Sequence, residues 1–289
     1  MLGIALSVCA LHLPHAPATS LGAQRAPLCA VRAADDKAEV TEYFNNEGFS
    51  RWNRIYSEDG EVNAVQMDIR KGHGETVDKV LQWVDADGTA QSGSTFCDAG
   101  CGVGSLALPL AQRGATVSAS DISDAMVKEA TTRAAAVGVS ERAKFMTSDL
   151  EALSGSYDTV TCIDVMIHYP TDQVRAAPPA SWHGPRCNMR GSAAVLTPRA
   201  RDQMAGMVKH LSTLADKRLI ISFAPDTWFY RGLKSFGELF PGPSKTTRAY
   251  LHKEDAVVDA LKAAGFSLKR TEMTGTNFYF SRLLEAVRD

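Results

Sequence analysis

The segment with the strongest chemical signal is the heptapeptide Asp98–Gly104, which reads DAGCGVG. It follows the apolar residues 95–97 and precedes a helical pattern, so its glycines let a ligand approach the backbone closely at a helix start. The spacing differs from the Gly-x-Gly-x-x-Gly pattern of dinucleotide sites, because only one residue separates the second and third glycines. Asp98 would repel a pyrophosphate and attract a cationic amino group. The loop therefore predicts a site for a ligand that carries a cation.

Other candidate ligand-binding residues follow the predicted strands. Asp121 closes the strand 115–120 and can accept both hydroxyls of a ribose, while Asp149 follows the strand 144–146 and can accept an adenine amino group. Each is also a common loop or N-cap residue, so the argument depends on several such features falling in register. A cationic amino acid joined to a nucleoside is S-adenosylmethionine. We predict a site for it formed by Asp98, Gly100, Cys101, Gly102, Gly104, Asp121, Ile122, Met126, Asp149, Leu150 and Asp164.

The elements that must position these residues alternate between strand and helix. The pattern predicts strands at 95–97, 115–120, 144–146, 157–163 and 218–223, with helices at 105–112, 124–136 and 204–214. Such alternation predicts a doubly wound, mostly parallel α/β sheet. A helix at 255–264 ends at Gly265, and two further strands, 267–273 and 277–285, are joined by a Thr-Gly-Thr turn. We therefore expect seven strands with an antiparallel C-terminal edge, preceded by helices over 35–87.

Several motifs beyond the glycine loop point to a narrower family. The loop itself resembles that of class I methyltransferases, which have a Rossmann-like fold. Together with the other motifs, residues 36–288 are similar to the magnesium-protoporphyrin IX O-methyltransferase family of chlorophyll biosynthesis, with an interruption near residue 174. The motifs that carry this resemblance are Tyr43–Phe49, Arg51–Tyr56, Gly60–Asn63, Asp164–Pro170, Phe240–Tyr250 and Phe278–Arg282.

The resemblance implies methyl transfer from S-adenosylmethionine to a propionate carboxylate of magnesium-protoporphyrin IX, which gives the monomethyl ester. A carboxylate is already nucleophilic at neutral pH, so alignment and water exclusion matter more than a strong base, and no metal site is expected. The resemblance implies catalytic roles for Tyr56 and His168. His168 would orient the propionate by a hydrogen bond or attract it as a cation; contact with magnesium is less favoured because magnesium prefers oxygen. Substrate-binding candidates are Trp52, Tyr169, Lys245 and Arg248.

The aromatic residues of the helical segment 35–87 allow two interpretations. They would form a movable lid that stacks on a flat macrocycle and excludes water. Alternatively, they are ordinary core residues. Two other functions also stay open at this point, because fold alone does not determine function. These are a non-catalytic tetrapyrrole-binding protein on the same fold, and another small-molecule O-methyltransferase acting on an acid or phenol.

The overall composition restricts the class of protein further. The chain has 31 Lys and Arg against 33 Asp and Glu, which argues against a nucleic-acid-binding protein. No apolar run reaches the roughly 18 residues of a membrane span, so we expect at most peripheral membrane contact, with Trp228, Phe229 and Tyr230 as candidates. The resemblance suggests the large subunit of magnesium chelatase as a partner. The six cysteines are scattered and form no Cys-x-x-Cys pair.

Two segments differ from the rest of the chain. Residues 1–34 contain two arginines and no acidic residue, which is typical of a plastid targeting segment, although a disordered tail has a similar composition. We therefore expect a plastid protein, stromal or peripherally membrane-associated, with a methyltransferase domain over 35–289. Without residues 1–34 and 174–203, the chain carries 24 basic and 32 acidic residues.

The segment 174–203 has no helical or strand period and holds four of the twelve prolines. Loops of this length are uncommon inside compact domains. Removing it joins Gln173 to Met204 and restores the family's pattern. Its first and last residues, Val174 and Gln203, are compatible with the GT and AG ends of an intron. We therefore interpret it as an insertion or a retained intron.

Overall fold

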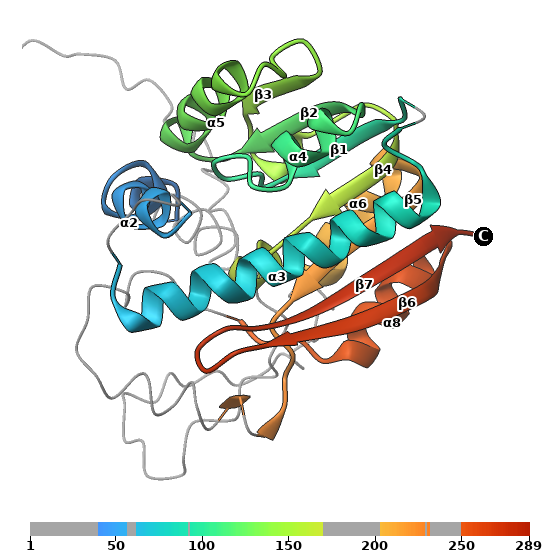
Figure 1. The fold of residues 1–289 in the computed structure, drawn as a ribbon. Helices are drawn as coiled ribbons and strands as arrows, with labels where there is room; N and C mark the ends of the chain where they lie inside the picture. Colours follow the sequence, from blue (N-terminus) through green and yellow to red (C-terminus); the bar gives the residue numbers. More distant parts are fainter. Residues whose placement is uncertain (1–39, 57–61, 92, 170–202, 229, 232–249) are drawn as a thin grey trace, which may run out of the picture.

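A seven-stranded sheet forms the centre of the computed structural model, which describes residues 40–56, 62–91, 93–169, 203–228, 230–231 and 250–289 (Figure 1). The strand order is β3-β2-β1-β4-β5-β7-β6. The first five strands of the chain run parallel, and β7 runs antiparallel to both β5 and β6. The predicted class I sheet is thus confirmed. The strands are β1 (Thr95–Ala99), β2 (Thr116–Asp121), β3 (Ala143–Thr147), β4 (Tyr157–Cys162), β5 (Ala215–Phe223), β6 (Phe266–Gly275) and β7 (Phe280–Arg288).

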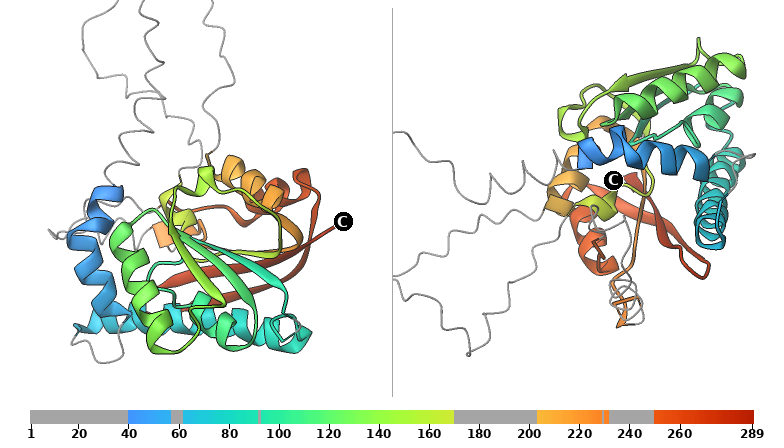
Figure 2. Two further views of the ribbon diagram at one scale, coloured as in Figure 1. Left: turned by 90° about the horizontal axis from the view of Figure 1, so that it is seen from above. Right: turned by 90° about the vertical axis from the view of Figure 1, so that its left-hand side faces the viewer.

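Helices cover both faces of the sheet. Figure 2 shows α3, α4 and α5 on one face, α6 and α8 on the other, and α2 standing at one end of the sheet, apart from both layers. Two single turns, η1 (Leu150–Ala152) and η2 (Met166–His168), follow β3 and β4. The helices are α2 (Glu47–Ile55), α3 (Ala64–Asp87), α4 (Ala107–Gln112), α5 (Asp124–Ala136), α6 (Gln203–Leu214) and α8 (Glu254–Ala263).

The long helix α3 begins and ends at clear sequence signals. Asn63 accepts a hydrogen bond from the Gln66 backbone at 2.9 Å, and the Gln66 side chain accepts one from the Asn63 backbone at 3.2 Å, which is a capping box. The helix ends at Gly88, whose φ of 64° is left-handed. Only its second half joins the core, through Val77, Val80, Leu81, Trp83 and Val84. Its first half extends past the sheet toward α2 (Figure 1).

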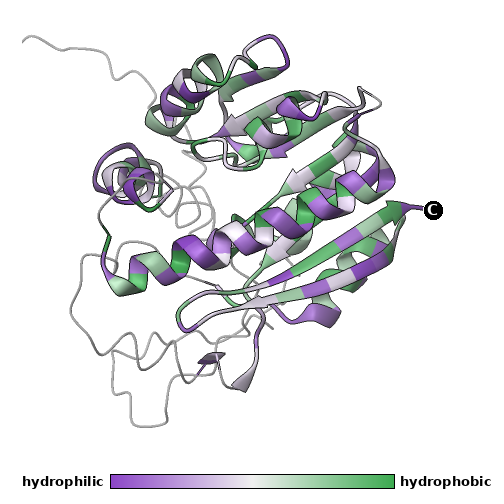
Figure 3. Cartoon of the chain, in the orientation of Figure 1, coloured by the Kyte–Doolittle hydropathy of each residue, from purple (hydrophilic) through white to green (hydrophobic). Residues whose placement is uncertain are grey.

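The core consists of two apolar clusters, one on each face of the sheet. One includes Phe96 of β1 and Leu110 of α4, and the other includes Phe223 of β5, Leu211 of α6 and Leu261 of α8. Each such side chain contributes roughly 1.5–3 kcal/mol on burial. Hydrophobic and hydrophilic residues are mixed along both the strands and the helices (Figure 3). This packing fixes the carboxyl ends of β1, β2 and β4 at one edge.

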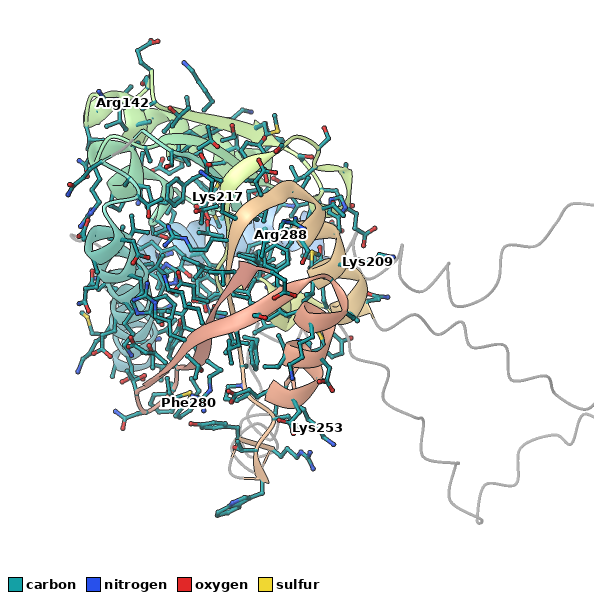
Figure 4. The ribbon with its side chains drawn as sticks, turned by 90° about the vertical axis from the view of Figure 1, so that its right-hand side faces the viewer. Arg142, Lys209, Lys217, Lys253, Phe280 and Arg288 are labelled. Atoms are coloured by element: carbon teal, nitrogen blue, oxygen red, sulfur yellow. The ribbon has the colours of Figure 1, made fainter. Side chains whose placement is uncertain are left out.

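The C-terminal hairpin differs from the sequence prediction in its turn. Gly275 pairs with Phe280 inside the hairpin, so the turn comprises residues 276–279 rather than Thr-Gly-Thr. The reason is tertiary, because the Asp68 carboxylate on α3 accepts hydrogen bonds from the Phe278 backbone and the Thr276 hydroxyl, both at 2.6 Å. The second strand therefore starts three residues later than expected. Figure 4 labels Phe280 and Arg288, the two ends of β7.

Candidate functional site

A cavity of about 560 Å³ lies at the carboxyl edge of the sheet, bounded by α2 and the first half of α3. It brings together most of the residues that the sequence singled out. Gly104 does not line it, and Lys245 and Arg248 fall outside the residues that the structure describes. The predicted residues on its wall are Trp52, Tyr56, Asp98, Gly100, Cys101, Gly102, Asp121, Ile122, Met126, Asp149, Leu150, Asp164, His168 and Tyr169.

The glycine loop requires glycine at two positions for different reasons. Gly100 has a φ of 82°, and a Cβ there would lie 2.2 Å from the Val165 side chain. Gly104 has a φ of 86°, and a Cβ there would lie 3.1 Å from Leu108, so this residue serves helix packing rather than the cavity wall. The Gly100 and Cys101 amides donate to the Ser120 carbonyl at 2.8 and 2.9 Å. These bonds hold the loop against β2, and the absence of side chains at the glycines lets a ligand approach the backbone closely.

Asp98, the second-last residue of β1, is the most unusual polar group of the cavity. Its side chain is buried, and its Oδ1 accepts a hydrogen bond from the Thr161 hydroxyl at 2.8 Å. Its Oδ2 has no hydrogen-bond partner among the described residues. Burial raises the pKa of Asp98 to about 6. A buried, unpartnered carboxylate oxygen on a cavity wall fits a ligand ammonium group, which would supply the missing partner.

The two other predicted aspartates differ in how much of their acceptor capacity is used. Asp121 accepts hydrogen bonds from the Gly102 amide at 3.0 Å and the Ser123 amide at 2.9 Å, and each carboxylate oxygen retains further acceptor capacity. Burial raises the pKa of Asp121. Asp149 caps η1 by accepting from the Glu151 amide at 3.1 Å, and it also lines the cavity. Both positions are compatible with ribose and adenine contacts.

An aromatic wall faces this acidic end of the cavity. Tyr56 lies at the C-terminus of α2, and its ring centroid is 5.6 Å from that of Trp52 and 4.5 Å from that of His73. Burial raises the pKa of Tyr56 well above its ordinary value, so its hydroxyl keeps its hydrogen at neutral pH. The Trp52 Nε1–H has no acceptor among the described residues. The wall therefore combines flat apolar surface with hydrogen-bond donors.

His168 occupies η2, opposite Phe44, whose ring meets it edge-on at 5.5 Å. Its Nδ1 is buried without a partner among the described residues, and burial lowers the pKa of His168 to about 4. The side chain is thus neutral near pH 7, which favours hydrogen bonding over attraction as a cation. The His252 ring bonds to the Met166 carbonyl at 2.8 Å and fixes the turn that carries His168.

Asp164, which the sequence predicts as a cofactor ligand, lines the cavity, and the protein's own side chains hydrogen-bond to its carboxylate. His73 lies 2.7 Å away, the Tyr279 hydroxyl donates at 2.8 Å, and the Ser222 hydroxyl donates at 3.0 Å. Burial would raise the pKa of Asp164, but these bonds, first that from His73, lower it. Its φ of 60° is left-handed, a strained conformation that the surrounding bonds maintain. Asp164 therefore connects α3 to the end of β4 and the C-terminal hairpin.

Sequence reasoning missed His73, Ser105 and Tyr279. His73 bonds through Nε2 to the Ser105 hydroxyl at 2.9 Å, and all three residues line the cavity. His73 and Asp164 are 91 positions apart, and Tyr279 and Asp164 are 115 apart. No local spacing signals such pairs; only the doubly wound topology brings them together.

The sheet order, the glycine loop and the acidic cavity define a class I S-adenosylmethionine-dependent methyltransferase. Comparison with known proteins agrees with this class and narrows it. Residues 96–179 match a family described as a methyltransferase domain, and residues 195–288 match the magnesium-protoporphyrin IX methyltransferase C-terminus. The chain belongs to the magnesium-protoporphyrin IX O-methyltransferase family.

Two curated relatives establish this membership. The chain is 51% identical over 257 residues to the magnesium-protoporphyrin O-methyltransferase of Synechocystis sp., a match that covers 89% of this chain and 98% of the relative. It is 49% identical over 253 residues to the chloroplastic magnesium protoporphyrin IX methyltransferase of Arabidopsis thaliana, covering 87% and 71%. A crystal structure of the Synechocystis enzyme with bound SAH superposes with a TM-score of 0.71, at 48% identity, over 88% of this chain and 100% of that one.

Proposed function

We propose that this protein transfers a methyl group from S-adenosylmethionine to a propionate carboxylate of magnesium-protoporphyrin IX. One observation carries the proposal: a single cavity joins the unpartnered carboxylate oxygen of Asp98 to the aromatic wall of Trp52, Tyr56 and His168. The acidic end suits the cationic methionine part of the cofactor, and the aromatic end suits a flat macrocycle. The relatives' names give the same substrate.

The chemistry places modest demands on the protein. The cofactor supplies an activated methyl group on a sulfonium sulfur. A propionate oxygen forms the new O–C bond as the C–S bond breaks, and no proton has to be removed from an ionised carboxylate. The protein must therefore hold the two reactants in line and keep water out. The apolar lining of the cavity serves the second requirement.

Two side chains fit the alignment role. Tyr56 keeps its hydroxyl hydrogen, because burial raises its pKa, and can donate a hydrogen bond to a propionate oxygen. His168 is neutral and has an unpartnered ring nitrogen, so it can donate to the same group or accept from a neighbouring donor. We assign both to propionate positioning. Trp52 and Tyr169 are proposed to contact the macrocycle, and Lys245 and Arg248 remain candidates for a propionate clamp.

The movable part of the helical segment is proposed to be shorter than 35–87. The residues Val77 to Val84 belong to the main core, so the second half of α3 cannot move without disrupting the sheet packing. α2 contributes no residue to either apolar core cluster, and hydrogen bonds from Arg70 to its last carbonyls and from Arg133 to Asn53 attach it to the rest of the protein. We therefore place the lid in α2.

The two alternative functions fit the same observations less well. The ubiquinone biosynthesis O-methyltransferase of Pseudomonas paraeruginosa is 33% identical over 31% of this chain only, which disfavours a quinone substrate. A non-catalytic tetrapyrrole-binding protein would not need the unpartnered Asp98 oxygen at a cofactor site. The test is incubation with S-adenosylmethionine and magnesium-protoporphyrin IX, followed by mass spectrometry. A gain of one CH₂ is expected, and no gain with folded protein that binds SAH would refute the substrate assignment.

The cellular context is also a proposal. The acid-free segment 1–34 and the chloroplastic relative from Arabidopsis thaliana support a plastid location. Within the described residues, no helix is both long and apolar enough to cross a membrane. Of the three candidates for peripheral membrane contact, Trp228 is 85% exposed, Tyr230 is half-buried on the cavity wall, and Phe229 lies outside the residues that the structure describes. Binding to the large subunit of magnesium chelatase rests on the family resemblance alone.

The segment 174–203 is proposed to be dispensable for catalysis. The two family matches together leave residues 180–194 uncovered, all of them inside this segment. Removing it places Gln173 where Gln203 begins α6, so the first residue of the helix is unchanged. A deletion variant is expected to retain or exceed the turnover of the full chain. Transcript sequencing tests the intron interpretation, which fails if these codons are present in the dominant mature mRNA.

A further inference from the structure

Four side chains converge on the carboxylate of Asp164, which the proposed methyl transfer does not use. They come from four parts of the fold: His73 of α3 lies 2.7 Å away, and Ser222 of β5, Tyr279 of the hairpin turn and Ser281 of β7 donate at 3.0, 2.8 and 3.3 Å. Asp164 also has a left-handed φ of 60°, which is costly for a residue other than glycine. Such strain persists where the surrounding structure fixes a residue, as it often does at active sites.

The backbone of Asp164 determines where His168 lies. Asp164 is the second residue after β4, and Val165 is the N-cap of η2, the single turn that carries His168. The His168 amide donates to the Val165 carbonyl at 3.0 Å, and the Val165 side chain packs on Gly100, where a Cβ would lie 2.2 Å from it. Because η2 is so short, a change in the φ of Asp164 would move His168 together with the whole turn.

The side chain of Asp164 reaches Tyr56 through His73. The His73 ring bonds to Asp164 through Nδ1 and to the Ser105 hydroxyl through Nε2, at 2.7 and 2.9 Å, so its position and its plane are both fixed. The Tyr56 ring lies against this ring, with the two centroids 4.5 Å apart. Since α2 contributes no residue to either core cluster, contacts such as this one determine where the Tyr56 side chain lies.

Tyr279 connects the Asp164 carboxylate to α3 and to the C-terminal hairpin. Its ring packs on α3, where a Cβ on Gly72 would lie 2.3 Å from it. Its hydroxyl oxygen lies 2.8 Å from Asp164 Oδ2 and 3.0 Å from the Thr76 hydroxyl oxygen. The hairpin itself runs alongside α3 (Figure 1). A single hydroxyl therefore holds the chain that leaves β4 against both α3 and the hairpin.

We propose that Tyr279 is a positioning residue for methyl transfer, which fixes Tyr56 and His168 relative to each other by bonding to Asp164. The inference rests on the proposed function, which assigns those two side chains to the propionate. A propionate oxygen must lie in line with the methyl carbon and the sulfur, and a misplacement of about 1 Å can cost on the order of 100-fold in rate. Tyr279 does not contact the reacting atoms in this account.

The test is Tyr279→Phe, which keeps the ring on Gly72 and removes the hydroxyl alone. With magnesium-protoporphyrin IX as substrate, kcat is expected to fall roughly 10- to 100-fold, whereas the Kd of SAH should change less than about twofold. A role in stability alone would lower the Tm and leave kcat unchanged at temperatures well below it. An unchanged kcat, or a rise in the SAH Kd as large as the fall in kcat, overturns the inference.

Double variants test whether Tyr279 acts through Tyr56 and His168. In a Tyr56→Phe background, the hydroxyl that needs positioning is absent, so Tyr279→Phe should lower kcat by a smaller factor than it does in wild type. The same expectation holds in a His168→Ala background, where the ring that needs positioning is absent. An equal factor in wild type and in either background overturns the inference.

Tyr157→Phe is the matched control. Tyr157 of β4 is half-buried, its hydroxyl donates to the Ser154 carbonyl at 3.4 Å, and it does not line the cavity. This variant should leave kcat, KM and the SAH Kd unchanged. If Tyr279→Phe does not fold, Ser281→Ala removes a longer bond to the same carboxylate and should lower kcat to a lesser extent; an unchanged kcat there overturns the inference. A wild type that binds SAH but does not methylate magnesium-protoporphyrin IX would instead contradict the proposed function.

Discussion

Replacing Asp98 by asparagine should make the free protein more stable while it removes cofactor binding. The folded protein holds the pKa of Asp98 at about 6 because the group is buried, whereas its ordinary value is 3.8. Each pKa unit corresponds to about 1.4 kcal/mol, so ionised Asp98 costs the folded state about 3 kcal/mol at pH 8. Asparagine has nearly the same shape and can still accept the hydrogen bond from Thr161. The variant avoids the cost of burying a charge.

The size of this effect depends on pH. Because folding raises the pKa of Asp98, its contribution to the free energy of unfolding is most favourable below the pKa of the unfolded chain and is lost as the pH rises through about 6. The advantage of Asp98→Asn should therefore be about 3 kcal/mol at pH 8, about half of that at pH 5, and small at pH 4. At pH 8 it corresponds to a rise in Tm on the order of 5–10 °C for a domain of this size.

The assay is thermal and urea unfolding between pH 4 and 8, with SAH binding measured on the same samples. Loss of the ion pair should weaken SAH binding on the order of 100-fold or more. Asp158→Asn is the control of opposite sign, because its hydrogen bond from Lys217 lowers the pKa of Asp158 to about 2, so this variant should lose stability at pH 8. Two results would refute the reasoning: an Asp98→Asn protein that is no more stable than wild type at pH 8, or a gain in stability at pH 4 that equals the gain at pH 8.

Three further predictions concern α3 and η2. Gly72→Ala should destabilise the fold by roughly 1–3 kcal/mol in urea unfolding, because its Cβ would lie 2.3 Å from the Tyr279 ring. Gly74→Ala should instead stabilise the fold by roughly 0.5–1 kcal/mol, because its Cβ would have no atom within 4 Å. Equal effects of the two substitutions would contradict this packing. With saturating cofactor and substrate, kcat should not report protonation of His168 between pH 6 and 8, since its pKa is about 4, and a His168-dependent inflection in that range would argue against a neutral ring. Arg70→Met should lower kcat and leave the SAH Kd unchanged. Arg70 donates hydrogen bonds at 2.5 and 2.8 Å to the last carbonyls of α2, so its loss affects the proposed lid and not the cofactor site. A loss of SAH affinity would contradict this.

Most of the fold could be predicted because its signals are local. The helix 124–136 matches α5 in both bounds, since Ser123 caps it by accepting from the Met126 amide. The start of β5 could not be predicted. It lies at Ala215, three residues before the expected start at Arg218, because the intervening Asp216 and Lys217 are exposed charged residues that give no strand signal. The burial of Arg218 against Glu285 of β7 also left no local pattern, because this ion pair joins residues far apart in the chain.

The same distinction between local signals and tertiary contacts applies to the residues of the site. Asp98 and Asp121 could be predicted, since a short motif and the ends of adjacent parallel strands suffice to place them together. The occupied state of Asp164 could not, because its partners His73 and Tyr279 come from segments on either side of it, far away in the chain. For the same reason, no local pattern indicates that a helix before the first strand supplies a bonded histidine to the cavity.

The position of β7 has a consequence for how the protein is made. β7 is the last strand to be synthesised, yet it lies between β5 and β6. Until residue 288 exists, β5 is an open edge and Asp164 lacks the Tyr279 and Ser281 hydroxyls. A nascent or prematurely terminated chain therefore cannot complete the cavity, however well its first five strands have folded. Cofactor binding in this cavity therefore depends on the last strand of the chain.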